Sequence, residues 1–236
     1  MGWTLIRKPC AIAPYEAAIS NVIFRHLFEQ WPMAFSKFTL KRVKTDLGIA
    51  VVEDRRLFPA DLPRVGISDH LQFTLDEFAP LALSINTEKS RSEWIIAPIL
   101  AELRRQFKRQ ISLFSGIAWS VDPAQGLDGV CDYIISGDAE QLYLSAPAIA
   151  IVEAKKEDII GGLGQCIATM YAASIFNQQE NNPIPCIYGA VTTGTNWKFL
   201  KLENKTAAVD LDEYFLREIE LLMGILVQIA ESSKLS

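Results

Sequence analysis

One stretch, residues 148–156, constrains the fold of this chain more than any other. It begins with an apolar run (AIAIV, 148–152) that is typical of a buried strand, and it ends in charged residues (EAKK, 153–156). Because strand side chains alternate between faces, the odd-numbered residues from Ile149 to Lys155 are expected to share one face. Burying the charges of Glu153 and Lys155 on that face costs desolvation free energy unless neighbouring groups of opposite charge or hydrogen bonds offset it. Two interpretations are open: the strand reaches the surface at Glu153 and ends in solvated charge, or Glu153 and Lys155 belong to a functional site.

A second strand-like run (VCDYII, 130–135) carries an aspartate among apolar residues. Aspartate is disfavoured within strands, so Asp132 is a candidate functional residue. Asp128 is an alternative, because it lies in an expected loop between Gly126 and Gly129 that would allow it to approach Glu153. An aspartate beside glycine is usually a turn former, however, and a site requires fixed geometry. Asp132 is therefore the preferred residue.

Together these residues form the pattern Asp132-(20 residues)-Glu153-x-Lys155 on two expected strands. The pattern resembles the core of the PD-(D/E)xK nuclease superfamily, which includes restriction endonucleases and RecB-like nucleases. The resemblance implies that Asp132 and Glu153 bind a metal ion and that Lys155 orients or activates the attacking water. Two carboxylates suit Mg²⁺, with Mn²⁺ as a substitute, and such an ion activates bound water and neutralises phosphate charge. The implied activity is hydrolysis of phosphodiester bonds in nucleic acid, with DNA as the first choice.

The segment 90–107 has the apolar spacing of a helix, with Ser90 and Glu93 as an expected capping box and Pro98 as an expected kink. In the resembled superfamily the helix before the core sheet often supplies an acidic metal ligand, and Glu93 is the matching position. Glu93 is therefore interpreted both as a capping residue and as a further metal ligand. Glu102 is a weaker alternative, because it stands among arginines and is expected to pair with them across one turn.

Three glycines at positions 161, 162 and 164 lead into an Ala-rich helix expected at about 164–176. They do not fit the patterns of nucleotide-binding loops, so they predict close packing of this helix on the sheet. RecB-like nucleases carry Gln-x-x-x-Tyr on the corresponding helix. Gln165 matches the glutamine, whereas Thr169 stands four residues later and the tyrosine is Tyr171. Gln165 is interpreted either as a residue that assists the site or as a solvent-exposed helix start.

Further strands are predicted at 111–121 and in a hairpin of 185–192 with 197–202. Asp210 and Glu213 predict a capping box that opens an amphipathic C-terminal helix, for which packing on the sheet and homodimerisation are both open. We expect an α/β (α+β) fold with a restriction endonuclease-like central mixed β-sheet flanked by helices. The expected division is an N-terminal extension at 1–85, packed on the core, and a nuclease core with its C-terminal helix at 86–236.

The sequence does not assign one function to the N-terminal extension. A lid, a specificity element, a dimerisation element and a part of the scaffold are all open. The extension is expected to contain a helix after Pro14, short strands at 38–40 and 49–52, and a loop at 58–63. A further helix is expected to start at Ser68 or Asp69, with Leu71, Leu75 and Phe78 on its apolar face.

Charge and composition limit the partners of the chain. The net charge of -5 argues mildly against nucleic acid, although four basic residues between 104 and 109 would provide a local positive surface. No apolar run reaches the ~20 residues that a membrane-spanning helix needs, and no secretory signal is evident. The four cysteines and two histidines form no zinc-binding spacing, which favours reduced cysteines in a cytoplasmic protein. Besides the nuclease, the sequence leaves open a catalytically inactive module that binds DNA or protein.

Overall fold

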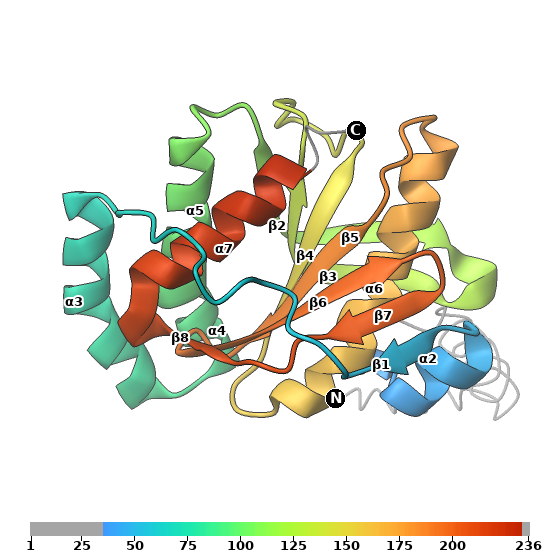
Figure 1. The fold of residues 1–236 in the computed structure, drawn as a ribbon, viewed down its shortest axis with the longest axis horizontal. Helices are drawn as coiled ribbons and strands as arrows, with labels where there is room; N and C mark the ends of the chain where they lie inside the picture. The colour runs from blue at the N-terminus through green and yellow to red at the C-terminus, as the bar shows by residue number, and fades with distance from the viewer. Residues whose placement is uncertain (1–34, 233–236) are drawn as a thin grey trace, which may run out of the picture. The chain divides into compact units, whose positions relative to one another are not determined.

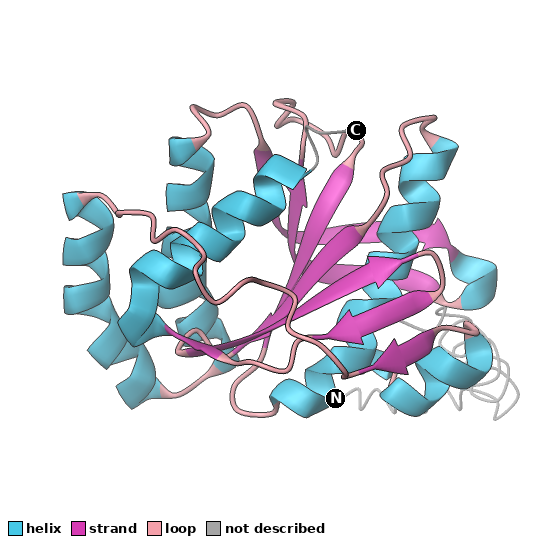
Figure 2. Ribbon diagram, in the orientation of Figure 1, coloured by secondary structure: helices cyan, strands magenta, loops and turns pink. Residues whose placement is uncertain are grey.

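An eight-stranded mixed β-sheet lies at the centre of the fold, with helices on both of its faces (Figures 1 and 2). The structure is a computed structural model that describes residues 35–232. The strand order is β1-β7-β6-β5-β4-β3-β2, and β8 pairs with β6. The strands are β1 (Ala50–Val52), β2 (Ser112–Asp122), β3 (Leu127–Ser136), β4 (Ala148–Ala154), β5 (Ile187–Thr192), β6 (Asn196–Glu203), β7 (Thr206–Val209) and β8 (Tyr214–Phe215). The expected mixed sheet flanked by helices is thus confirmed.

The helices divide between the two faces of the sheet and bury a separate apolar cluster on each. One face is covered by α3 (Asp69–Ile85), α5 (Ala97–Gln106) and α7 (Ile219–Ser232), and the other by α2 (Leu40–Asp46) and α6 (Ile159–Gln179). The short α4 (Glu88–Arg91) continues through a π-helical turn, Ser92–Ile96, into α5. Pro98 lies in the first turn of α5, so the expected interruption of this helix is confirmed, with the π-helical turn before the proline.

Strand β4 is buried along its whole length, and its register contains a bulge that changes which side chains share a face. Ile135 pairs with Ala150 and Ser136 pairs with Ala148, so Ile149 is an extra residue. Ile149 therefore packs in the cluster beneath α5 and α7, whereas Ile151 packs beneath α6. The predicted common face of Ile149 and Ile151 was wrong, because simple alternation does not cross a bulge.

Side chains that bind the backbone explain two further differences from the predicted elements. The expected strand at 38–40 is instead the start of α2, because the Thr39 hydroxyl accepts a hydrogen bond from Arg42 N at 3.3 Å and caps the helix. Asp210 does not open a helix. Its buried carboxylate accepts hydrogen bonds from Leu57 N at 3.2 Å and from Tyr214 Oη at 3.1 Å, so the chain continues as β8 and α7 begins only at Ile219.

Helix α3 follows the prediction at its start and departs from it on one face. Ser68 caps the helix by accepting a hydrogen bond from Leu71 N at 3.2 Å. Leu71 and Leu75 are buried as expected, but Phe78 is 38% exposed and Ala79 takes the core position instead. Strand β1, within the predicted extension 1–85, pairs in parallel with β7. The division at residue 85 stays a prediction, and the helix expected after Pro14 lies outside the described residues.

Helix α6 begins at Ile159, earlier than expected, because Asp158 caps it by accepting a hydrogen bond from Gly161 N at 2.8 Å. In the described part of the chain it is the one helix long and apolar enough to cross a membrane, and 61% of its apolar window is buried inside the protein. Buried core helices commonly meet the same criteria of length and composition, so this is weak evidence for a membrane span. Helix α7 packs on the sheet through Leu222, Leu226 and Ile229, while homodimerisation stays a prediction.

Candidate functional site

The two predicted carboxylates lie opposite each other on adjacent strands. In the antiparallel pair of β3 and β4, Tyr133 faces Val152, so the next position along the ladder places Asp132 opposite Glu153. Ala154 N donates a hydrogen bond to Asp132 Oδ2 at 2.8 Å, which fixes the aspartate against β4. Glu153 is only 2% exposed, so the interpretation of this strand end as solvated charge was wrong.

Lys155 completes a cluster with Glu153 and Gln165 directly after β4. Its backbone N–H donates to Thr192 O at 2.8 Å, which seats it at the carboxyl end of β5. Its ammonium Nζ donates to Glu153 Oε1 at 2.6 Å and to Gln165 Oε1 at 3.3 Å. The structure therefore brings Asp132, Glu153, Lys155 and Gln165 together, and Gln165 is not merely a solvent-exposed helix start.

A glycine in the first turn of α6 makes room for the lysine side chain. A Cβ atom at Gly162 would lie 2.7 Å from Val191 Cγ1 on β5 and 3.1 Å from Lys155 Cε. A side chain at this position would thus collide with the sheet and with the lysine stem. The prediction that these glycines allow α6 to pack closely on the sheet is confirmed at Gly162, which lies beside the Lys155 side chain.

Burial and like charge shape the ionisation of the cluster. Burial and the negative charge of Asp132 together raise the pKa of Glu153 to about 8, because Lys155 only partly opposes them. For Lys155, burial is the largest single influence and lowers the pKa, but the charge and hydrogen bond of Glu153 together with the charges of Glu88 and Asp132 outweigh it, so the net shift of the pKa is upward. Near neutral pH Glu153 therefore favours its protonated form, and a bound cation would relieve the repulsion that Asp132 exerts on it.

The donors near Asp132 and Glu153 fit a hard cation that keeps most of its water. Asp132 Oδ1 and Glu153 Oε2 are not used in the hydrogen bonds described above, and Mg²⁺ in proteins commonly takes one or two carboxylates and several waters. Among residues 35–232, no set of three His, Cys, Asp or Glu side chains lies close enough to hold a metal ion. The two carboxylates thus suit Mg²⁺ better than they suit a metal that needs a closed protein cage.

Glu93 lines a pocket of about 280 Å³ together with Asp132, Ser92 and Lys89. It is exposed and forms an ion pair with Lys89 at 3.0 Å. The predicted capping box at Ser90 and Glu93 was wrong, because Thr87 is the N-cap and exchanges hydrogen bonds with Ser90 instead. Glu93 shares a pocket with the aspartate, and its role as a metal ligand stays a prediction.

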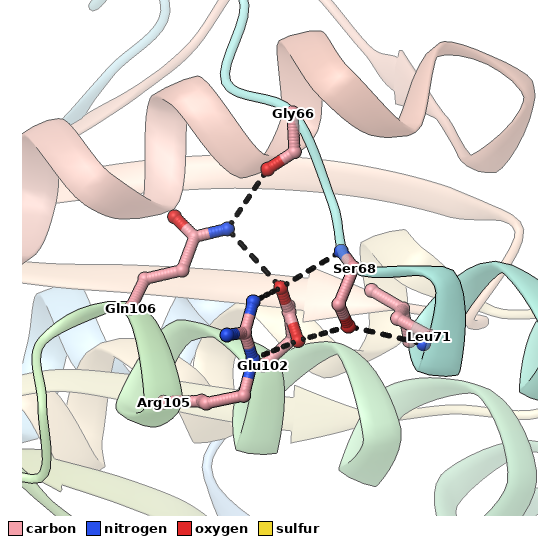
Figure 3. A network of polar contacts seen from close by, with 6 residues as sticks. All are labelled: Gly66, Ser68, Leu71, Glu102, Arg105 and Gln106. Atoms are coloured by element: carbon pink, nitrogen blue, oxygen red, sulfur yellow. Dashed lines mark hydrogen bonds and ion pairs between the residues drawn. The ribbon is translucent and has the colours of Figure 1, made fainter.

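Glu102 lies away from the cluster and has a structural role, as Figure 3 shows. Its carboxylate accepts hydrogen bonds from Ser68 N at 3.1 Å and Ser68 Oγ at 2.8 Å, and it pairs with Arg105. The bond from Arg105 lowers the pKa of Glu102 to about 2 despite burial of the carboxylate. The expected pairing of Glu102 with a neighbouring arginine is confirmed, and it ties α5 to the start of α3.

Asp128 is also separate from the cluster. It lies within β3, opposite Ser120, and not in a flexible loop as the glycines on either side of it suggested. Four strand residues separate it from Asp132, which corresponds to roughly 13 Å. Asp132 is therefore the aspartate that the fold brings to Glu153.

Three residues in α4 or just before it belong to the surroundings of the site and were not predicted. Asn86 Nδ2 donates to Glu157 Oε1 at 3.3 Å, and Arg91 Nη1 donates to Thr193 O at 2.9 Å. The charge of Glu88 contributes to the raised pKa of Lys155. These contacts place α4 over the carboxyl ends of β4 and β5, and identifying Thr87 as the cap would have indicated them.

No family model, no curated protein and no solved structure matches this chain. The geometry of the cluster is therefore the basis on which its function is inferred.

Proposed function

We propose that the chain is a Mg²⁺-dependent nuclease that hydrolyses phosphodiester bonds of DNA on a restriction endonuclease-like fold. The observation that carries the proposal is the placement of Asp132 opposite Glu153, with Lys155 Nζ at 2.6 Å from the glutamate. Two hard oxygen donors and an ammonium at one strand end are the groups that phosphodiester hydrolysis requires. The order helix α5, strands β2 to β4, helix α6, strand β5 supports the fold assignment.

In this proposal Asp132 and Glu153 hold the metal ion through their remaining oxygens. When bound, Mg²⁺ supplies a water of lowered pKa and neutralises charge on the scissile phosphate. Occupancy requires Glu153 to lose the proton that its raised pKa favours, so metal binding should release protons and weaken as the pH falls. Glu93, across the shared pocket from Asp132, remains the proposed additional acidic group.

Lys155 acts on the nucleophile. Its ammonium is held by Glu153 and by Gln165, which limits where it can point. A fixed ammonium beside the metal-binding carboxylates can orient the attacking water and stabilise negative charge that develops on the phosphate oxygens. Gln165 positions the lysine and so assists indirectly.

The proposal is tested by incubating supercoiled plasmid, linear duplex and single-stranded DNA with Mg²⁺, Mn²⁺ or EDTA. Lys155→Ala should abolish metal-dependent cutting. Lys156→Ala is the matched control, because Lys156 is the next residue, its side chain is half exposed, and its Nζ lies 3.8 Å from Glu157. Cutting that survives Lys155→Ala would place the activity elsewhere or in a contaminant, and no cutting of any substrate would contradict the nuclease assignment.

One observation favours a second candidate, a catalytically inactive module that binds DNA or protein. Lys155 Nζ already binds Glu153 at 2.6 Å, and no set of three His, Cys, Asp or Glu side chains among the described residues could hold a metal ion. If the Lys155 ammonium permanently occupies the place of the metal ion, the protein would bind its partner without catalysing hydrolysis. Thermal unfolding distinguishes the two, because millimolar Mg²⁺ or Mn²⁺ should raise the melting temperature of an enzyme through Asp132 and Glu153 and leave that of a scaffold unchanged.

A further inference from the structure

Arg91 lies at the carboxyl ends of the strands that carry the candidate site. Its Nη1 donates to Thr193 O at 2.9 Å, and Thr193 directly follows Thr192, whose carbonyl accepts the Lys155 backbone N–H at 2.8 Å. Figure 1 shows α4 at the lower end of the sheet, whereas the junction of α5 with β2 lies at the upper end. Arg91 is therefore a neighbour of the site, and the basic residues at 104–109 are far from it.

The guanidinium of Arg91 is half buried and has neutral partners. Nε and Nη2 both donate to Asn86 Oδ1, at 3.4 and 3.1 Å, and Nη1 donates to the Thr193 carbonyl. Within residues 35–232, no carboxylate lies within ion-pair distance of Arg91, whereas Arg42, Arg55, Arg56, Arg64 and Arg105 each have one. A partly desolvated cation without an anion is costly, so a missing anionic partner is the expected explanation.

The hydrogen bonds that Arg91 does make hold it ready for such a partner. A guanidinium has five N–H groups, and the contacts to Asn86 and Thr193 use three of them. The two that remain are one on each terminal nitrogen, Nη1 and Nη2, and these are the nitrogens through which a guanidinium binds phosphate. Asn86 is itself fixed, because it ends α3 in a left-handed conformation and donates to Glu157.

We propose that Arg91 binds a phosphate of the nucleic-acid backbone next to the one that is cut, and that Asn86 and the Thr193 carbonyl hold it in position. This inference rests on the proposed nuclease function and adds a substrate contact to it. It also explains how a chain of net charge -5 can bind DNA, because the positive charge that matters would be local to the site.

The test measures binding of a fluorescein-labelled 20-base-pair duplex by anisotropy in EDTA, over a series of salt concentrations, together with steady-state cleavage in Mg²⁺. We expect Arg91→Gln to weaken binding about tenfold, to reduce the slope of log K against log salt by about 0.9, and to raise KM more than it lowers kcat. Arg91→Lys should keep the salt slope but bind less tightly than the wild type, because it retains charge and loses the fork. Arg109→Gln is the charge-matched control at the opposite end of the sheet.

A purely structural role for Arg91 predicts a different result. Arg91→Gln would then lower the melting temperature and kcat, with the salt slope unchanged, and that outcome would overturn the inference while leaving the nuclease function intact. A reduced salt slope in Arg109→Gln but not in Arg91→Gln would place the DNA on the 104–109 surface and would also overturn it. Absence of cleavage by the wild type contradicts the proposed function itself, and the inference would be lost with it.

Discussion

Replacement of Glu153 by glutamine should stabilise the metal-free protein, and the gain should grow with pH. The pKa of this carboxyl rises from the ordinary 4.5 to about 8 on folding, mainly through burial. Between these two values the folded protein holds a proton that the unfolded chain releases. A carboxyl with a raised pKa contributes stability that is present at low pH and is lost as the pH rises towards 8. Glutamine imitates the protonated form and has no proton to lose.

The magnitude follows from the same linkage. Each pH unit within this window lowers the free energy of unfolding of the wild type by up to about 1.4 kcal/mol relative to the variant. Between pH 6 and pH 8 the advantage of Glu153→Gln should therefore increase by about 1–2 kcal/mol, the lower part of the range allowing for relaxation around the buried group. The neighbouring Lys155 keeps a hydrogen-bond acceptor in the variant, because the glutamine oxygen can replace Glu153 Oε1.

Urea unfolding in EDTA at pH 6 and pH 8 measures this change. Glu180→Gln, which alters an exposed glutamate at the end of α6, is the matched control and should show no pH-dependent advantage. Added Mg²⁺ should then stabilise the wild type at pH 8 and have no effect on Glu153→Gln, because the cation takes the place of the proton. Parallel pH dependences for wild type and Glu153→Gln would refute the argument that the buried Glu153 holds a proton.

Three further outcomes are expected. Glu102→Ala should lower the free energy of unfolding at pH 7 by about 1–3 kcal/mol. A carboxyl with a depressed pKa stabilises the fold only while it is ionised, so this loss should shrink as the pH falls from 4.5 towards 2. Urea unfolding across this pH range measures the change. Gly162→Ala should lower the free energy of unfolding by about 1–3 kcal/mol, measured by thermal or urea unfolding, because the new Cβ would lie 2.7 Å from Val191 Cγ1. It should also reduce cleavage, because the same Cβ would displace the Lys155 side chain. Gln165→Ala should reduce cleavage without a comparable loss of stability, because it removes one of two acceptors that hold the Lys155 ammonium, and equal activity would contradict that positioning role.

Much of the sheet could be predicted from the sequence, because apolar alternation and turn residues are local signals. The hairpin of β5 and β6 and the burial of β4 follow from such patterns. Asp132, Glu153 and Lys155 could be selected because charge inside or beside a buried strand has few structural explanations. The fold then brings all three together.

The differences arise where a single side chain outweighs the pattern. Thr39 and Asp210 bind backbone groups and decide where a helix begins or fails to begin. The extra residue at Ile149 reverses the alternation of β4, and no periodicity reveals it. Likewise, Thr87 and not Ser90 is the N-cap of α4, and this local difference places Arg91 at the end of that helix.

The π-helical turn between α4 and α5 rotates the side chains of α4 about the helix axis relative to those of α5. One added residue in a helix corresponds to about 100° of rotation, so everything before the turn faces a different direction from the face that α5 buries. Here Ala97 N donates to Ser92 O, five residues back, and Arg91 lies just before the turn. A chain shortened by one residue within 92–96 would keep its apolar core positions on α5 but turn Arg91 away from Thr193. A single codon deletion would thus separate the packing of α5 from the orientation of Arg91.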